Sequence, residues 1–112
     1  DVSSRTIEVF DIEGVRLRYV NVHGVEGKVL AMELKQNSGY GTGHINKGDT
    51  IVIQEDADIK DMDVIMFECD DGFLVGQIMG KMIVHKSVQY NDPRNLADVK
   101  VVGKVVQCIK TF

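Results

Sequence analysis

The stretch VIMFECDDGFLVGQIMGKMIVHK, residues 64–86, decides the fold class of this chain. It contains three runs of apolar and β-branched residues, which are separated by DDG at 70–72 and by MGK at 79–81. Both separators are short and offer a glycine for a tight turn, which is typical of the connection in a β-hairpin. The stretch therefore predicts three consecutive antiparallel strands.

The same pattern extends along the whole chain and predicts an all-β domain. A helical period of 3.6 residues is nearly absent, Pro93 is the only proline, and β-branched runs alternate with Gly and Asp. We expect loops at residues 38–43 and 91–97, with one helical turn in the second, and disorder at residues 1–5. The expected strands are residues 6–10, 16–22, 28–35, 50–54, 64–69, 73–79, 82–86 and 99–109.

Length and composition indicate a soluble protein of one domain. The chain has 112 residues, of which 44% are hydrophobic and 27% charged, and its apolar runs are too short for a membrane span or a signal peptide. We therefore expect a single β domain over residues 1–112, a cytoplasmic location and no membrane partner. The net charge of -4 argues against direct DNA binding, because phosphate contacts need clustered Lys and Arg.

No pattern in the sequence predicts a metal site, a cofactor or a small-molecule substrate. Cys69 and Cys108 are too few and too far apart for a disulfide framework or a zinc ribbon, so we expect two reduced thiols. His23 and His85 lack the paired spacing of a metal site. The acidic residues at 55–63 lack the spacing of a calcium loop, and we interpret them as a solvated turn.

From Leu34 onward, the features of the chain follow an order that is more specific than its composition. An expected strand is followed by Ser38, which lies in a glycine-bearing loop. Gly48-Asp49 comes next and leads into the apolar residues 51–53, which are part of the following strand. A serine loop followed by a Gly-Asp step and a strand is the first half of a recognisable series.

The later features complete this series. The segment DMDVI at 61–65 repeats the Gly-Asp step, with Met62 where glycine is usual. The hairpin strand 73–78 comes next, and VVGKVV at 101–106 is the last motif of the series. The order resembles that of the Ser-Lys self-cleaving domains of LexA, phage repressors and mutagenesis proteins, over about residues 30–112. The resemblance implies a compact LexA- or signal-peptidase-like β domain of short, mostly antiparallel strands.

The resemblance also implies a peptidase site in which one member is missing. Ser38 matches the position of the nucleophile, whereas Gly76 stands where the catalytic lysine is expected. A serine is a weak nucleophile until a neutral base removes its proton, so both members are needed. We therefore expect a degenerate peptidase-like domain that is not an enzyme. Self-cleavage by Ser38 with another base, such as His44 oriented by Asp49, is the enzymatic alternative.

A role in transcription regulation follows from the same resemblance. The main hypothesis is the oligomerisation domain of a phage or bacterial repressor, which forms a homodimer or higher homo-oligomer and reaches DNA only through an N-terminal domain not in this chain. The final strand is long and apolar at alternate positions, and we expect it to pair subunits as an edge strand. A translation-factor-like β-barrel binding module, suggested by the glycine-rich residues 41–50, is the alternative. The expected interface residues are Val101, Val105, Ile109 and Phe112.

Overall fold

The chain folds as an all-β domain, as its sequence predicts. A computed structural model describes residues 4–35, 45–70, 72–85 and 93–110. None of these residues forms a helix long and apolar enough to cross a membrane. The elements are β1 Ser4–Phe10, β2 Arg16–His23, β3 Val29–Glu33, β4 Thr50–Gln54, β5 Val64–Cys69, β6 Gly72–Met79, β7 Met82–Val84, β8 Arg94–Asn95, the 3-10 turn η1 Leu96–Asp98, and β9 Lys100–Ile109.

All the described strands belong to one mixed sheet. Their order is β2-β1-β3-β4-β9-β5-β6-β7-β8, so β2 and the two-residue β8 are its edges. Neighbours are antiparallel except β1 and β3, which pair in parallel over two residues, Val9 opposite Ala31 and Phe10 opposite Met32. The mostly antiparallel architecture expected from the sequence is therefore confirmed.

The predicted strand bounds agree most closely with the structure from residue 50 on. β4 and β5 begin and end where expected, and both hairpin turns are confirmed, with Gly72 at a φ of 98° and Gly80 at 65°. The predicted disorder at residues 1–5 is wrong for Ser4 and Arg5. These residues belong to β1 and lie opposite β2, and the Arg5 guanidinium donates a hydrogen bond of 2.8 Å to the Gly27 carbonyl.

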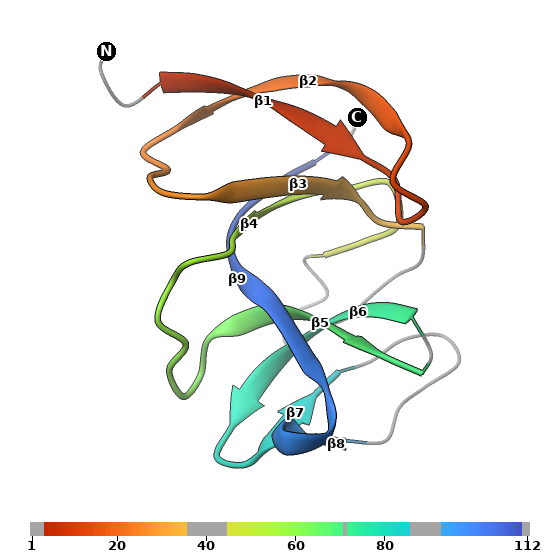
Figure 1. The fold of residues 1–112 in the computed structure, drawn as a ribbon, viewed down its shortest axis with the longest axis vertical. Coiled ribbons are helices and arrows are strands. Elements are labelled where there is room, and N and C mark those ends of the chain that lie inside the picture. The colour runs from red at the N-terminus through yellow and green to blue at the C-terminus, as the bar shows by residue number, and fades with distance from the viewer. Residues whose placement is uncertain (1–3, 36–44, 71, 86–92, 111–112) are drawn as a thin grey trace.

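β9 joins the two halves of the sheet. Its first half pairs with β5 and its second half with β4, and Lys104 lies opposite both Ile65 and Gln54. In Figure 1, β9 runs from the group of β1 to β4 above to the group of β5 to β8 below. Gly103 permits the close approach to β4, because a Cβ atom there would lie 2.6 Å from the Gln54 carbonyl oxygen and 2.6 Å from Ile53 Cγ2.

The predicted edge position of the last strand is wrong. β9 is an interior strand, bonded to β4 on one side and to β5 on the other. A long apolar strand is compatible with either position, and only the pairing of its two rows of backbone groups distinguishes an edge from an interior. Subunits cannot pair along β9 unless β4 or β5 first detaches.

Hydrophobic side chains fill the space on both faces of the sheet. Successive residues of β4 enter different clusters, since Ile51 and Ile53 lie in one and Val52 in another. β5 is divided in the same way, with Met66 in the first cluster and Phe67 in a third. The strands that flank β9 are therefore buried on both faces, which explains why they read as nearly continuous apolar runs.

Candidate functional site

The residues proposed for the peptidase site are only partly covered by the structure. Ser38 and His44 lie outside the described residues, as does Phe112 of the expected interface. Gly76 lies in the middle of β6, opposite Ile65 of β5, and Asp49 immediately precedes β4. The described part of the candidate site therefore consists of the surroundings of Gly76 and the turn that contains Asp49.

Gly76 is packed closely against the segment that contains β7. A Cβ atom at Gly76 would lie 2.6 Å from Ile83 Cγ2, 2.9 Å from the Val84 carbonyl oxygen and 3.2 Å from His85 Cβ. His85 is itself buried, and its ring meets the ring of Phe67 edge-on, with the centroids 5.9 Å apart. The position expected to hold a catalytic lysine thus has no room for any side chain in the present arrangement of β6 and β7.

Asp49 closes a tight turn before β4. Its Oδ2 accepts a 2.8 Å hydrogen bond from the Asn46 amide, and its own amide donates to the Asn46 carbonyl at 3.0 Å. Gly48 has a φ of 91°, and its amide donates to the Leu34 carbonyl at 2.9 Å. The Leu34 amide donates in return to the Asp49 carbonyl at 3.0 Å. These bonds fix the start of β4 to the residue that follows β3.

The same turn recurs before β5. Asp63 Oδ2 accepts from the Lys60 amide at 2.8 Å, and the Asp63 amide donates to the Lys60 carbonyl at 3.2 Å. The Met62 amide donates to the Ile78 carbonyl at 2.7 Å, and the Ile78 amide donates to the Asp63 carbonyl at 2.9 Å. Met62 has a φ of 72°, the one positive φ of a non-glycine residue among the described residues. This backbone conformation explains why glycine suits the position.

Lysines connect the two turns to β9 and to the residue that follows it. Lys110 Nζ lies 2.7 Å from Asp49 Oδ2, and Lys104 Nζ lies 3.5 Å from Asp63 Oδ1. Because β4 and β5 flank β9, the turns hold the strand from its two sides. The two Gly-Asp steps are visible in the sequence, whereas the role of these lysines is not. Nothing in the sequence connects Lys104 or Lys110 to the aspartates.

The neighbours of Asp49 stabilise its charged form. Burial alone would raise the pKa of Asp49, but the hydrogen bonds from Lys110 and the Asn46 amide outweigh burial and hold the pKa below its ordinary value of 3.8. Cys108 Sγ lies 3.6 Å from Asp49 Oδ2, and burial, followed by the charge of Asp49, raises the pKa of this thiol above 9.0. At neutral pH the pair is a carboxylate beside an unreactive thiol.

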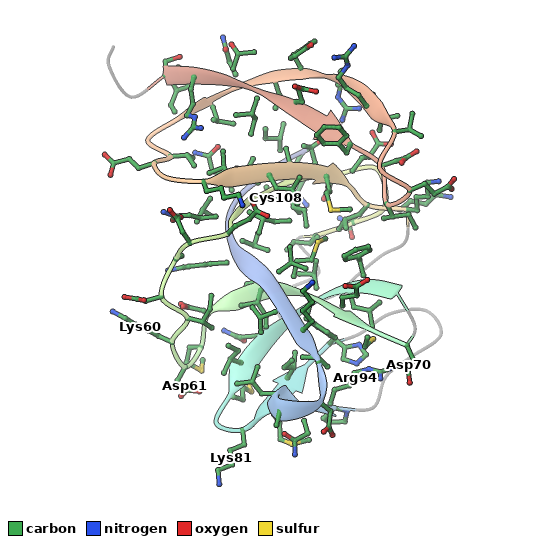
Figure 2. All side chains as sticks on the ribbon, in the orientation of Figure 1. Lys60, Asp61, Asp70, Lys81, Arg94 and Cys108 are labelled. Atoms are coloured by element: carbon green, nitrogen blue, oxygen red, sulfur yellow. The ribbon has the colours of Figure 1, made fainter. Side chains whose placement is uncertain are left out.

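The acidic loop at residues 55–63 is held by hydrogen bonds to its neighbours. Asp56 Oδ2 accepts from the Lys28 amide at 3.2 Å, and Asp61 Oδ1 accepts from the Gly80 amide at 2.7 Å. Figure 2 shows Asp61 beside Lys60 at the lower end of the molecule, with Lys81 further down. Within the described ranges, no group of three or more His, Cys, Asp or Glu residues is arranged to hold a metal ion.

The described interface candidates on β9 contribute to the core of their own chain. Val101, Val105 and Ile109 are each half-buried, and each packs against a different hydrophobic cluster. They are therefore divided among three parts of the core, and their role between subunits stays a prediction.

Large exposed hydrophobic side chains of the described residues gather mainly at two hairpins. The first group lies on β2 and on the turn that precedes it, and consists of Ile12, Val15, Leu17 and Tyr19. The second group lies near the β6–β7 hairpin and consists of Met62, Met79 and Met82. Beside the first group, a surface groove of about 320 Å³ is lined by residues that include Phe10, Tyr19 and Leu30. Exposed apolar groups of this kind are candidates for contact with another protein.

The fold and the site define this protein as an all-β domain in which two Gly-Asp-type turns hold a central strand. The chain matches no protein-family model, and no curated protein is a match for it.

Proposed function

We propose that this chain is the assembly domain of a phage or bacterial transcriptional repressor and that it has no peptidase activity. In this role two or more copies associate, while a DNA-binding domain outside this chain contacts the operator. The proposal places the protein in the cytoplasm, where the operator DNA is. The net charge of -4 supports this division of labour, because it disfavours direct contact with phosphates.

The observation that carries the proposal is the packing around Gly76. A self-cleaving domain of the resembled family needs a lysine here, with its amine directed at the serine. At Gly76 even a methyl group would meet Ile83 Cγ2 and the Val84 carbonyl oxygen at less than 3.0 Å. The carbonyl oxygen belongs to the backbone, so it cannot retreat without separating β6 from β7. This position supports strand packing rather than proton transfer.

The paired turns support the relation to the resembled family. Its sequence pattern contains two Gly-Asp steps, each followed by a strand, and the corresponding steps here are turns built from the same set of hydrogen bonds. Met62 keeps the left-handed conformation although it is not a glycine. A domain with this framework and without the base is suited to holding subunits together.

The assembly function is tested by attaching the chain to a monomeric DNA-binding head that recognises one half-site. Two heads in one dimer bind two half-sites, and the second contact then becomes intramolecular. We expect the fusion to bind a two-site operator at least about tenfold more tightly than the isolated head, with no such gain on a single half-site. Equal binding of the fusion and the isolated head to the two-site operator would refute the proposal.

The absence of peptidase activity is tested on the same fusion at alkaline pH, where a general base is most often deprotonated. We expect an intact chain after prolonged incubation at pH 10, with identical behaviour of the Ser38→Ala variant. A cleavage product that appears in the original protein and disappears with Ser38→Ala would identify the chain as an active self-cleaving domain instead.

A further inference from the structure

We infer that two copies of this chain associate through β2, by antiparallel pairing of β2 with the β2 strand of the second copy. The inference rests on the proposed assembly function and names the surface that would carry it. It replaces the edge role that the sequence suggested for the last strand.

β2 is the one long edge of the described sheet. It has eight residues and pairs with β1 on one side, whereas the edge strand at the other end of the sheet, β8, has two residues. The outer side of β2 presents a row of backbone donors and acceptors, and such a row is completed by another extended strand. The backbone groups of this edge therefore fit an extended strand as their partner.

From Arg18 to His23, the side chains of β2 alternate between the core side and the solvent side of the sheet, whereas a shift in the pairing register with β1 interrupts this alternation at Leu17. Val22 is buried, and Val20 packs against the same core cluster. Tyr19, on the opposite face, is 57% exposed, and Leu17, at the irregularity, is 41% exposed. Figure 1 shows β2 along the top of the molecule, away from the lower group of strands. An edge strand that has no further strand partner in the described sheet and carries exposed apolar side chains is a surface that aggregates unless a partner covers it.

The ion pairs of β2 favour a copy of itself over an acidic peptide. Arg16 Nη1 lies 3.7 Å from Glu8 Oε2, and Arg18 Nη1 lies 2.9 Å from Glu33 Oε1, so both arginines are paired within their own chain. The arginines of β2 therefore do not need acidic residues of a partner to form ion pairs. β2 itself contains none.

A two-fold axis perpendicular to the sheet would relate the two copies of β2 in such a pair. Such an axis places each residue of the regular part of β2, from Arg18 on, opposite a residue of the same face, because antiparallel partners share a face. With the axis at Tyr19, the two Tyr19 rings meet, Leu17 lies opposite Asn21, and Arg18 lies opposite Val20. No arginine lies directly opposite another arginine in this register, and each Arg16 guanidinium lies over the Tyr19 ring of its own chain, 5.3 Å from the ring centroid. Tyr and Arg near the centre also match the composition that protein interfaces favour.

Sedimentation velocity of the full chain between low and high micromolar concentration tests the inference. We expect the unchanged protein to dimerise. We expect Tyr19→Lys, which sets two ammonium groups against each other at the axis, to weaken dimerisation at least about tenfold. Met79→Lys is the matched control, because Met79 is also an exposed apolar strand residue, at 42%, but lies at the other hairpin. This control should change dimerisation less than about twofold.

Cross-linking gives a second measurement that does not depend on a destabilising charge. With oxidised glutathione as the oxidant, Tyr19→Cys should form a disulfide-linked dimer, identified by mass spectrometry at position 19. Leu17→Cys should not, because Leu17 lies opposite Asn21 in this register. The same reaction on the unchanged protein controls for Cys69 and Cys108.

The outcomes separate this inference from the proposed function. An unchanged protein that stays monomeric at every concentration overturns both. A dimer that Tyr19→Lys leaves intact overturns the β2 contact and leaves the assembly function standing, and so does a dimer that Met79→Lys disrupts equally. Absence of the position-19 disulfide in a dimeric protein overturns the register centred on Tyr19.

Discussion

Replacement of Gly76 by alanine tests the steric argument on which the loss of the base depends. The added methyl group would lie 2.6 Å from Ile83 Cγ2 and 2.9 Å from the Val84 carbonyl oxygen, whereas ordinary contact begins at 3.4 Å. β7 would therefore have to shift away from β6 by roughly half an ångström or more, and overpacking of this kind typically costs about 1–3 kcal/mol. We expect Gly76→Ala to lower the free energy of unfolding by about 2 kcal/mol.

Urea unfolding followed by circular dichroism measures this change. With a slope of about 2 kcal/mol per molar urea, a loss of about 2 kcal/mol moves the midpoint down by about 1 M. Gly80→Asn is the control, because Gly80 has a φ of 65° with open space around its Cβ position, and Asn tolerates this conformation. It should change stability by less than about 0.5 kcal/mol.

A double-mutant cycle isolates the contact between Gly76 and Ile83. Ile83→Ala removes the Cγ2 atom that the new methyl group would meet, so Gly76→Ala should cost less in this background, by about 0.5–1 kcal/mol. A Gly76→Ala variant as stable as the unchanged protein would refute the reasoning. It would show that β6 and β7 separate easily and that a side chain is tolerated at the position of the base.

Three further predictions concern the turns and the thiol. Met62→Gly should raise the free energy of unfolding by about 0.5–1 kcal/mol, because glycine adopts the left-handed conformation of this position without strain. The control Met79→Gly lies in an ordinary strand and should lower the free energy of unfolding. A lower free energy of unfolding for Met62→Gly, measured with urea, would contradict this prediction. Because the pKa of Asp49 is lowered in the folded chain, its carboxylate contributes to stability above about pH 4, and this contribution is lost as the pH falls through the folded-state pKa. Asp49→Asn should therefore flatten the acid limb of a curve of unfolding free energy against pH. An unchanged acid limb would contradict the pairing of Asp49 with Lys110. Because burial raises the pKa of Cys108, iodoacetamide should label this thiol at pH 8 more slowly in the folded chain than in urea. Equal labelling rates in the two conditions would contradict the raised pKa of the folded-state thiol.

The sequence predicted the strands well where local signals determine them. In residues 64–86, the apolar runs and the turn glycines lie within a few residues of one another, so strand and turn are both encoded locally. The partners of β9 were not predictable in this way. They depend on contacts between distant segments, and an apolar strand of ten residues fits an edge or an interior equally well.

The surroundings of the candidate site residues could not be predicted from the sequence. The order of motifs located Gly76 and both Gly-Asp steps, and it marked Met62 as a residue in a glycine position. Only the structure shows that Gly76 is confined by Ile83 and the Val84 carbonyl oxygen, and that Lys104 and Lys110 hold the two turns. These contacts join residues that have no regular spacing in the sequence.

The interior position of β9 also bears on how subunits could associate. Pairing along β9 would first require β4 or β5 to detach, which breaks a ladder of hydrogen bonds worth about 0.5–1.5 kcal/mol each and exposes side chains buried on both faces. It would also break the contact of Lys110 with Asp49 or that of Lys104 with Asp63. Pairing along β2 breaks no strand contact of the described sheet and adds hydrogen bonds to a row that has no strand partner there. Of the two strands, β2 is therefore the one that can contact a second copy without partial unfolding.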